Sequence, residues 1–236
     1  MPGSLARRFV NLANLAFGGS CYLCRGAAQG VLCAECDADL PRLQGAACPR
    51  CALPSPGGAL CGRCLSHAPA YDGTVAALAY EFPADVLVQG LKFRGELALA
   101  PLLGQLLAAR LPRGTRVDYI VPVPLARARL GERGFNQALE IARPLAAATG
   151  CRLAPLLAAR ERDTRPQLDL PLEARARNVR GAFRCTQALE RASIALVDDV
   201  MTTGATLEEL AATLKRAGAA HVVNWVVART APRAHA

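Results

Sequence analysis

From residue 73 onward, the hydrophobic and polar positions of the chain alternate between two periods. Short apolar runs bounded by turn residues are typical of buried strands, and apolar positions spaced three or four residues apart are typical of helices. The pattern predicts strands at residues 73–82, 116–124, 193–197 and 221–228. It predicts helices at residues 83–96, 99–111, 136–150 and 206–219. Alternating strands and helices indicate an α/β domain with a mainly parallel sheet flanked by helices.

Residues with preferences for helix ends support these boundaries. Pro83 suits the start of a helix, and Thr206 is predicted as an N-cap because its hydroxyl oxygen can accept a hydrogen bond from the first turn. Gly150 and Gly218 are predicted to end two helices, since glycine tolerates the left-handed conformation. Pro144 lies inside a predicted helix, where we expect a kink.

The chain before residue 68 follows neither period for long. Apolar residues recur at helical spacing near the start, which predicts a short amphipathic helix at residues 1–19. Asn11 and Asn14 interrupt the apolar stretch, so a targeting segment is not expected. No run of about 20 apolar residues occurs, so we expect no membrane span, and a cytoplasmic location is the default.

Residues 20–67 carry eight of the ten cysteines, arranged as four CxxC pairs. The pairs are Cys21 and Cys24, Cys33 and Cys36, Cys48 and Cys51, and Cys61 and Cys64. Zinc binds four thiolates as a tetrahedron, and a CxxC turn brings two sulfurs to one ion. The simplest pairing is sequential, with the first four cysteines on one ion and the last four on another. An interleaved pairing is the alternative.

Disulfides and redox thiols are the competing interpretations of these cysteines. Clustered CxxC pairs in a chain expected to be cytoplasmic favour metal over disulfides. A redox motif of the thioredoxin type occurs once, between a strand and a helix, rather than four times. We therefore predict a double zinc ribbon at residues 20–67 with up to two structural zinc ions, because the protein fills all four positions on each.

The charge of the chain is strongly basic, with a net charge of +9. Only Lys92 and Lys215 are lysines, and the remaining basic residues are arginines, whose planar forks suit phosphate and carboxylate groups. This balance favours a phosphate-bearing ligand or nucleic acid as partner. A GC-rich genome would produce the same bias.

The segment after the strand at 193–197 combines two kinds of polar group. Asp198 and Asp199 come first, followed by a Thr/Gly loop and a helix. Backbone N–H groups at a helix N-terminus bind anions, and Gly204 permits close approach. No lysine follows the glycine as it does in a P-loop. A sugar phosphate would use both groups, with its phosphate in the loop and its hydroxyls on the acids. Two solvated aspartates beside an ordinary helix start are the alternative.

The segment IALVDDVMTTGATLEEL (194–210) resembles the phosphoribosyl pyrophosphate (PRPP) motif of type I phosphoribosyltransferases. The segments VPVPLARARLGERGFNQA (121–138), RERDTRPQ (160–167) and RARNVRGAF (175–183), together with the CxxC pairs, resemble the ComF family, which is associated with natural competence. The resemblance implies a type I phosphoribosyltransferase-like domain at residues 68–236, with Asp198 and Asp199 on the ribose hydroxyls. The remaining PRPP-binding residues would be Val200, Met201, Thr202, Thr203, Gly204, Ala205 and Thr206.

The resemblance also implies a pyrophosphate site and a catalytic loop. Pyrophosphate would contact Val123, Pro124 and Leu125, with Arg133 nearby. A flexible loop at about 158–180 would carry Arg165, which joins Asp198 and Asp199 as a candidate catalytic residue. Cationic side chains and Mg²⁺ would stabilise the leaving pyrophosphate. For the arginines, a solvated basic face is the alternative.

Two functions are consistent with these features. One is Mg²⁺-dependent transfer of ribose 5-phosphate to an unidentified acceptor with release of pyrophosphate, in DNA uptake or nucleotide metabolism. The other is a non-catalytic single-stranded DNA-binding protein of the competence machinery that uses the site as a phosphate or PRPP sensor. Competence proteins are possible partners in either case. The chain has only six Phe, four Tyr and one Trp, so no platform for stacking bases is evident.

Overall fold

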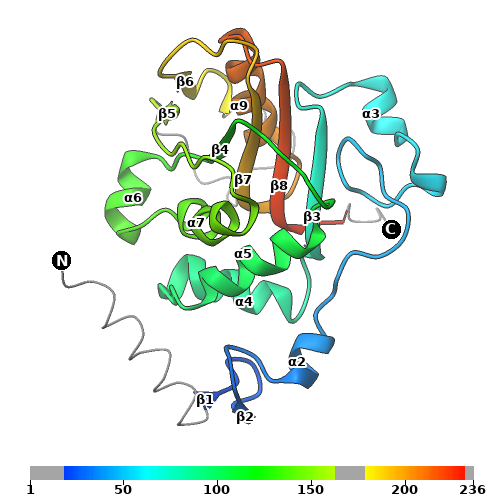
Figure 1. Ribbon diagram of the computed structural model, residues 1–236, viewed down its shortest axis with the longest axis vertical. Helices are drawn as coiled ribbons and strands as arrows, with labels where there is room; N and C mark the ends of the chain where they lie inside the picture. Colours follow the sequence, from blue (N-terminus) through cyan, green and yellow to red (C-terminus); the bar gives the residue numbers. More distant parts are fainter. Residues whose placement is uncertain (1–18, 163–178, 232–236) are drawn as a thin grey trace.

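A computed structural model describes residues 19–162 and 179–231 of the chain. At its centre lies a four-stranded sheet with the order β3-β8-β7-β4, in which every neighbouring pair is parallel (Figure 1). The strands are β3 (Gly73–Ala79), β4 (Tyr119–Pro122), β7 (Ser193–Met201) and β8 (His221–Arg229). The predicted α/β fold with a parallel sheet is therefore confirmed, whereas residues 1–18 of the helix predicted at 1–19 lie outside the described residues.

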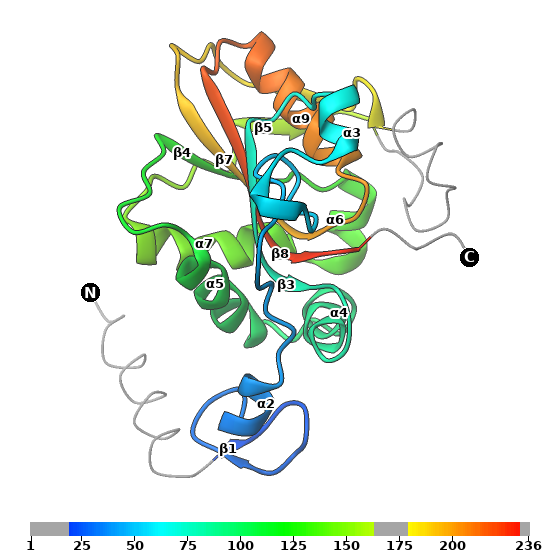
Figure 2. The ribbon, with the colours of Figure 1, turned by 90° about the vertical axis from the view of Figure 1, so that its right-hand side faces the viewer.

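Helices cover both faces of this sheet and bury its apolar side chains. They are α4 (Ala84–Arg94), α5 (Leu99–Arg110), α7 (Gln137–Thr149) and α9 (Ala205–Arg216). Successive residues of a strand point to opposite faces, and β7 shows this directly. Ile194 and Leu196 pack with the apolar side of α9, whereas Ala195 and Val197 pack with α4, α5 and α7 (Figure 2).

The observed helix and strand ends correct two of the predictions. Strand β7 continues to Met201, so Asp198 and Asp199 lie within the strand rather than after it. Helix α9 begins at Ala205 with Gly204 as its N-cap, so the assignment of Thr206 as the cap is wrong. Gly204 takes this position because its φ of 86° lies in the left-handed region, which glycine adopts without strain.

Several short elements were not predicted from the hydrophobic pattern. They are β1 (Gly19–Ser20), β2 (Ala27–Ala28), α2 (Ala34–Ala38), η1 (Pro56–Gly58), α3 (Gly62–Ser66), α6 (Arg127–Arg133), β5 (Ala158–Arg160) and β6 (Phe183–Cys185). Helix α6 contains no buried residue and therefore has no apolar stripe. Strands β5 and β6 form an antiparallel pair.

The two cysteine groups lie in different parts of the molecule. The segment with β1, β2 and α2 lies beside α4, and the segment with η1 and α3 lies beside β3 (Figures 1 and 2). Tyr22 and Leu40 of the first segment join the apolar cluster of α4 and α5. Ala52 and Leu53 of the second segment join the cluster that includes α9. Each cysteine group is thus anchored to a different face of the sheet.

Among the helices within residues 19–162 and 179–231, none is both long enough and apolar enough to cross a bilayer.

Helices α5 and α7 approach each other closely at Gly104. A Cβ atom at Gly104 would lie 2.6 Å from Pro144 Cγ and 2.9 Å from the carbonyl oxygen of Ile141. Pro144 itself lies inside the continuous helix α7. Because the second contact is with backbone, neither helix can relieve it by a change of rotamer.

We predict that Gly104→Ala lowers the free energy of unfolding by about 1–3 kcal/mol, as overpacking does in well-packed cores. Gly131→Ala in α6 is the matched control, since a Cβ there meets no atom within 4 Å. The control should leave stability unchanged or raise it by up to about 1 kcal/mol, because alanine favours the helix. Urea denaturation followed by circular dichroism measures both, and equal stability of the two variants would contradict the close approach.

Candidate functional site

A cavity of about 460 Å³ lies at the carboxyl ends of β7 and β4. One wall comes from the end of β7 and the start of α9, and the others come from the end of α4, the turn after β4, and α6. Its lining residues are Tyr80, Lys92, Phe93, Val123, Pro124, Leu125, Arg129, Glu132, Arg133, Gln137, Arg160, Asp198, Asp199, Val200, Met201, Thr202, Gly204, Ala205, Thr206 and Leu207. Ligands of parallel α/β sheets bind at this edge.

The two adjacent aspartates of β7 have different surroundings. Asp199 is only 3% exposed and forms an ion pair with Lys92, with 2.9 Å between its Oδ2 and the Nζ of Lys92. Asp198 is less buried, and its Oδ1 accepts a hydrogen bond from the backbone N–H of Asp199 at 2.9 Å. The alternation of the strand therefore directs the carboxylate of Asp199 toward Lys92 of α4, while both aspartates line the cavity.

These surroundings shift the pKa values of the two carboxyl groups in opposite directions. Burial, reinforced by the charge of Asp199, raises the pKa of Asp198 well above its ordinary value. Burial also acts to raise the pKa of Asp199, but the ammonium group of Lys92 holds it below its ordinary value. Likewise, burial opposes the charged form of Lys92, but Asp199 raises the pKa of Lys92 above its ordinary value. The arrangement favours one ionised carboxylate, paired with a cation, beside one that holds its proton more tightly.

Lys92 is a site residue that the sequence patterns did not single out. It lies near the C-terminal end of α4, about a hundred residues before the aspartates. The sequence feature that could have indicated Lys92 is its residue type, because it is one of two lysines in an arginine-rich chain.

The loop between β7 and α9 presents backbone N–H groups at a helix N-terminus. Among the residues that the structure describes, no acceptor is found for the N–H groups of Thr203 and Gly204. The hydroxyl oxygen of Thr203 accepts a hydrogen bond from the N–H of Ala205 at 3.3 Å, which turns this side chain back toward the loop. Thr203 is accordingly the one predicted PRPP-binding residue that does not line the cavity. Free N–H groups and the dipole of α9 together favour an anion here.

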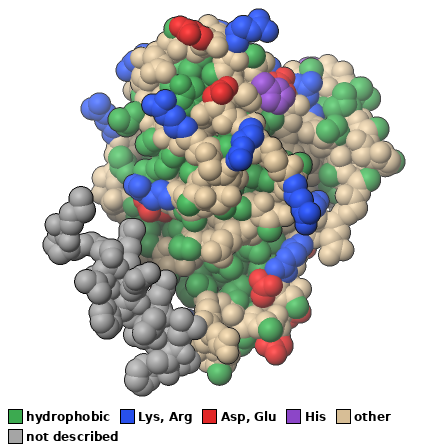
Figure 3. Space-filling view, in the orientation of Figure 1, with side chains coloured by type: hydrophobic (Ala, Val, Ile, Leu, Met, Phe, Trp, Pro, Cys, Tyr) green, Lys and Arg blue, Asp and Glu red, His purple; other side chains and the backbone are tan. Residues whose placement is uncertain are grey.

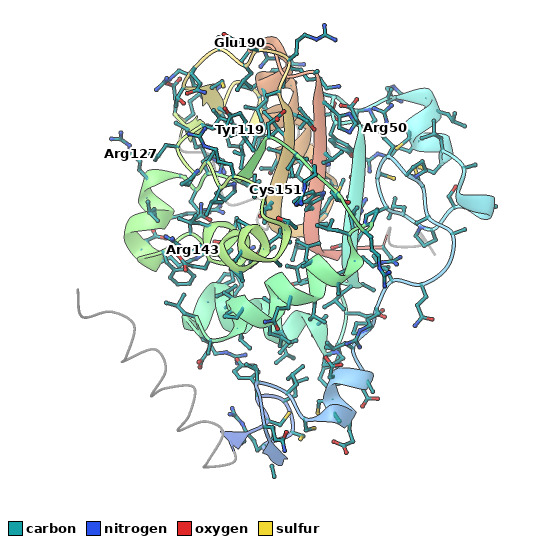
Figure 4. The ribbon with its side chains drawn as sticks, in the orientation of Figure 1. Arg50, Tyr119, Arg127, Arg143, Cys151 and Glu190 are labelled. Carbon is teal, nitrogen blue, oxygen red and sulfur yellow. The ribbon has the colours of Figure 1, made fainter. Side chains whose placement is uncertain are left out.

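A second part of the cavity lining carries guanidinium groups from α6. Arg129 and Arg133 line the cavity, whereas Arg127 of the same helix points away from the molecule (Figure 4). The buried Nη2 of Arg129 has no hydrogen-bond partner within residues 19–162 and 179–231. Burial lowers the pKa of Arg133, and its Nη1 donates a hydrogen bond to Gln137. A buried guanidinium N–H without an acceptor is costly, so this wall is suited to a negatively charged ligand.

The turn after β4 holds the remaining residues predicted to contact pyrophosphate. The N–H of Val123 donates to the carbonyl of Val197 at 2.9 Å, and the carbonyl of Val123 accepts from Nδ2 of Asn136 at 3.0 Å. Pro124 and Leu125 follow and line the cavity beside Arg133. Arg165 lies outside the described residues.

The eight cysteines form two groups, Cys21, Cys24, Cys33 and Cys36, and Cys48, Cys51, Cys61 and Cys64. Within each group the four sulfur atoms lie within 4.8 Å of one another, so the grouping is sequential and not interleaved. The Sγ atoms of Cys24 and Cys33 are 3.7 Å apart, and those of Cys51 and Cys61 are 3.6 Å apart. A tetrahedron with Zn–S distances of about 2.3 Å requires sulfurs about 3.8 Å apart, so both groups fit zinc.

The surroundings of the sulfur atoms favour one thiolate in each group, because a hydrogen bond with Cys33 raises the pKa of Cys36 and burial raises the pKa of Cys64. Burial acts to raise the pKa of Cys21 and of Cys48, but backbone N–H groups aimed at each sulfur lower both values to about 6. The thiolate is the form that binds metal. Cys151 and Cys185 belong to neither group.

Comparison with solved structures finds partial likenesses to phosphoribosyltransferases. Glutamine PRPP amidotransferase from B. subtilis aligns over 54% of this chain with 22% identity and a TM-score of 0.38, and the chain spans about a quarter (25%) of that protein. Purine phosphoribosyltransferase from Pyrococcus horikoshii aligns over 66% of this chain and 78% of that chain, with 19% identity and a TM-score of 0.31.

Comparison with characterised families and proteins gives a more extensive match. A family model described as a double zinc ribbon domain matches residues 12–65. DNA utilization protein YhgH of Salmonella typhimurium is 39% identical over 90% of this chain and 97% of its own length. Competence protein F of Haemophilus influenzae is 30% identical over 72% of this chain and 78% of its own length. The chain therefore belongs to the ComF family of competence and DNA utilization proteins.

Proposed function

We propose that the chain binds PRPP together with Mg²⁺ and transfers ribose 5-phosphate to an acceptor with release of pyrophosphate. The observation that carries the proposal is the division of one cavity between two kinds of wall. Asp198, Asp199 and the start of α9 supply one part of its lining, and Arg129 and Arg133 of α6 supply another. A ligand with hydroxyls at its centre and phosphates at both ends uses every one of these groups.

The first wall would hold the ribose and its 5′-phosphate. The carboxylate of Asp199 is ionised by its pairing with Lys92 and can accept a hydrogen bond from a ribose hydroxyl. Asp198 lies one residue earlier and can take the neighbouring hydroxyl. The N–H group of Gly204, at the start of α9, has no acceptor among the described residues and would bind the phosphate.

The second wall would hold the pyrophosphate. The unpartnered Nη2 of Arg129 and the guanidinium of Arg133 supply the positive charge that a departing pyrophosphate needs. Mg²⁺ would bind through the pyrophosphate oxygens and neutralise part of the developing charge. The chain's own residues would orient the ligand and exclude water from the ribose carbon.

The names of the relatives support a role in DNA utilization or competence for a protein of this kind. They also favour single-stranded DNA as a second candidate ligand. Phe93 is 60% exposed at the mouth of the cavity, and the guanidinium carbon of Arg133 lies 5.7 Å from the centre of its ring. An exposed aromatic ring beside a cation is the arrangement on which nucleic acid bases stack. Elsewhere, the basic side chains are scattered over the face seen in Figure 3.

The zinc proposal is tested by metal content. We expect purified wild-type protein to contain two zinc ions per chain, one for each four-cysteine group. Cys24→Ser/Cys33→Ser and Cys61→Ser/Cys64→Ser should each lose one of the two ions. Elemental analysis by mass spectrometry measures the ratio. Cys151→Ser/Cys185→Ser is the control and should keep both ions, so a loss of zinc from that variant would refute the assignment.

The ribose assignment is tested by exchanging each aspartate singly for asparagine. Asp198→Asn and Asp199→Asn should each weaken binding of PRPP with Mg²⁺ by about tenfold or more, because each removes a carboxyl group that hydrogen-bonds a ribose hydroxyl. Isothermal calorimetry measures the affinity, and Asp39→Asn, an exposed aspartate at the end of α2, is the control. Wild-type affinity in both cavity variants would exclude the proposed ribose site.

The same two variants should change stability in opposite directions at pH 7. Folding raises the pKa of Asp198, so the stability that this group contributes is present below its unfolded pKa and is lost as the pH rises through the raised folded value. Asp198→Asn should therefore raise the melting temperature at pH 7. Folding lowers the pKa of Asp199, whose contribution is present above its unfolded pKa. Asp199→Asn leaves Lys92 unpaired and should cost about 1–3 kcal/mol.

The DNA candidate is tested by salt dependence and by one aromatic pair. Affinity for single-stranded oligonucleotides should fall steeply as salt rises if phosphates are contacted. Phe93→Ala should weaken binding by about tenfold, whereas Phe82→Ala, which removes a 76% exposed ring, should not. Fluorescence anisotropy across salt concentrations measures both effects. Equal losses in the two variants, or affinity independent of salt, would count against DNA as a ligand of this site.

A further inference from the structure

The last residue of β8, Arg229, joins the second cysteine group to the loop between β7 and α9. Its side chain is buried, with only 3% of the residue exposed. Its Nε donates to the carbonyl oxygen of Cys51 at 2.9 Å. Its Nη1 donates to the carbonyl of Met201 at 2.8 Å and also to the carbonyl of Thr202. One guanidinium group therefore contacts the backbone of a cysteine ligand and the backbone of the loop.

Two further contacts join the same parts of the molecule. Arg63 lies between Cys61 and Cys64, and its Nη2 donates to the carbonyl of Thr203 at 2.6 Å. Tyr71 packs in one apolar cluster with Cys48, Cys51 and Cys64, and a Cβ at Gly204 would lie 3.2 Å from its hydroxyl oxygen. Each of residues 201–204 is thus contacted by a side chain that also lies against the second cysteine group.

These contacts determine which way the loop presents its N–H groups. In a planar trans peptide the C=O of one residue and the N–H of the next point in opposite directions. The carbonyls of Met201, Thr202 and Thr203 are held by the two arginines. The N–H groups of the residues that follow them are therefore directed away from the arginines. Two of these residues, Thr202 and Gly204, line the cavity.

The charge of Arg229 explains why the metal matters to this arrangement. No carboxylate lies within ion-pair distance of Arg229 anywhere in the described parts of the chain, and burial lowers its pKa. A buried cation without a counter-charge is unfavourable. Zinc held by four thiolates carries net negative charge, so a loaded second group would supply that counter-charge beside Arg229.

We propose that the second cysteine group positions the phosphate-binding loop through Arg229 and Arg63, so that metal in this group, but not in the first, sets the loop's affinity for phosphate. The inference rests on the proposed function, in which the loop between β7 and α9 holds a phosphate. The first group offers an internal comparison. It packs against α4, where Tyr22 accepts a hydrogen bond from Arg94 at 3.0 Å, and none of its described contacts reaches residues 201–206.

The test compares matched changes in the two groups of the full-length chain. Cys61→Ser/Cys64→Ser should weaken binding of PRPP with Mg²⁺ by about tenfold or more, whereas Cys24→Ser/Cys33→Ser should change it by less than about twofold. Zinc content and melting temperature are measured for each variant. Equal effects of the two double substitutions on affinity would overturn the proposal.

Arg63→Ala provides a second variant that retains all eight cysteines. It should weaken PRPP binding by about tenfold with zinc content unchanged, since one charge-assisted hydrogen bond to the loop is lost. Arg25→Ala, an exposed arginine directly after Cys24, is its control and should bind as wild type does. Wild-type affinity in Arg63→Ala would count against the proposal.

Hydrogen exchange without any ligand separates this proposal from the proposed function. Backbone amides of residues 201–206 should exchange faster in Cys61→Ser/Cys64→Ser and in Arg63→Ala than in wild type, but not in the two controls. Faster exchange in a chain that binds no PRPP would support the positioning role and reject the ligand. Unchanged exchange in a chain that binds PRPP would reject the positioning role alone.

Discussion

The ion pair between Lys92 and Asp199 is the interaction on which the site depends. It joins α4 to the central strand β7 across 2.9 Å, with the side chain of Asp199 almost fully buried and that of Lys92 24% exposed. Because successive residues of a strand face opposite sides, Asp199 pairs with Lys92 whereas Asp198 forms no ion pair among the described residues, although both line the cavity. Two like charges that would otherwise repel each other are thereby given separate surroundings. A buried pair of this kind contributes less to stability than to fixing where each group lies.

Much of the fold follows from patterns that any parallel α/β domain must show. The apolar run at 193–197 suits few structures other than a buried strand, and the periodic stretch at 136–150 suits few other than a helix. Both elements are present, with ends shifted by a few residues. The ends were less predictable because they depend on single conformations. A hydroxyl at Thr206 suggested an N-cap, but the left-handed φ of Gly204 decides where α9 begins.

The site was predictable where it is local in sequence and unpredictable where it depends on packing. Asp198, Asp199 and the loop after them lie next to one another in the chain, so their composition alone indicated a ligand. Lys92 reaches them only through the packing of α4 on the sheet, and Arg229 only through the register of β8 with β7. The sequential grouping of the cysteines was the simplest of the expected pairings, and the sulfur positions agree with it. The spacing of the cysteines did not indicate that the two groups pack on different faces of the sheet.

The strand order has a consequence for how the chain is made. Strand β3 lies at the edge of the sheet, and its neighbouring strand in the sheet is β8, which comes about 150 residues later and near the end of the described chain. During synthesis, β3 and the cysteine segments before it leave the ribosome long before β8 exists. Domains whose pairing is this distant in sequence complete their cores late. The sheet, its buried Arg229 and the loop that Arg229 holds therefore take shape only when the last strand has been translated.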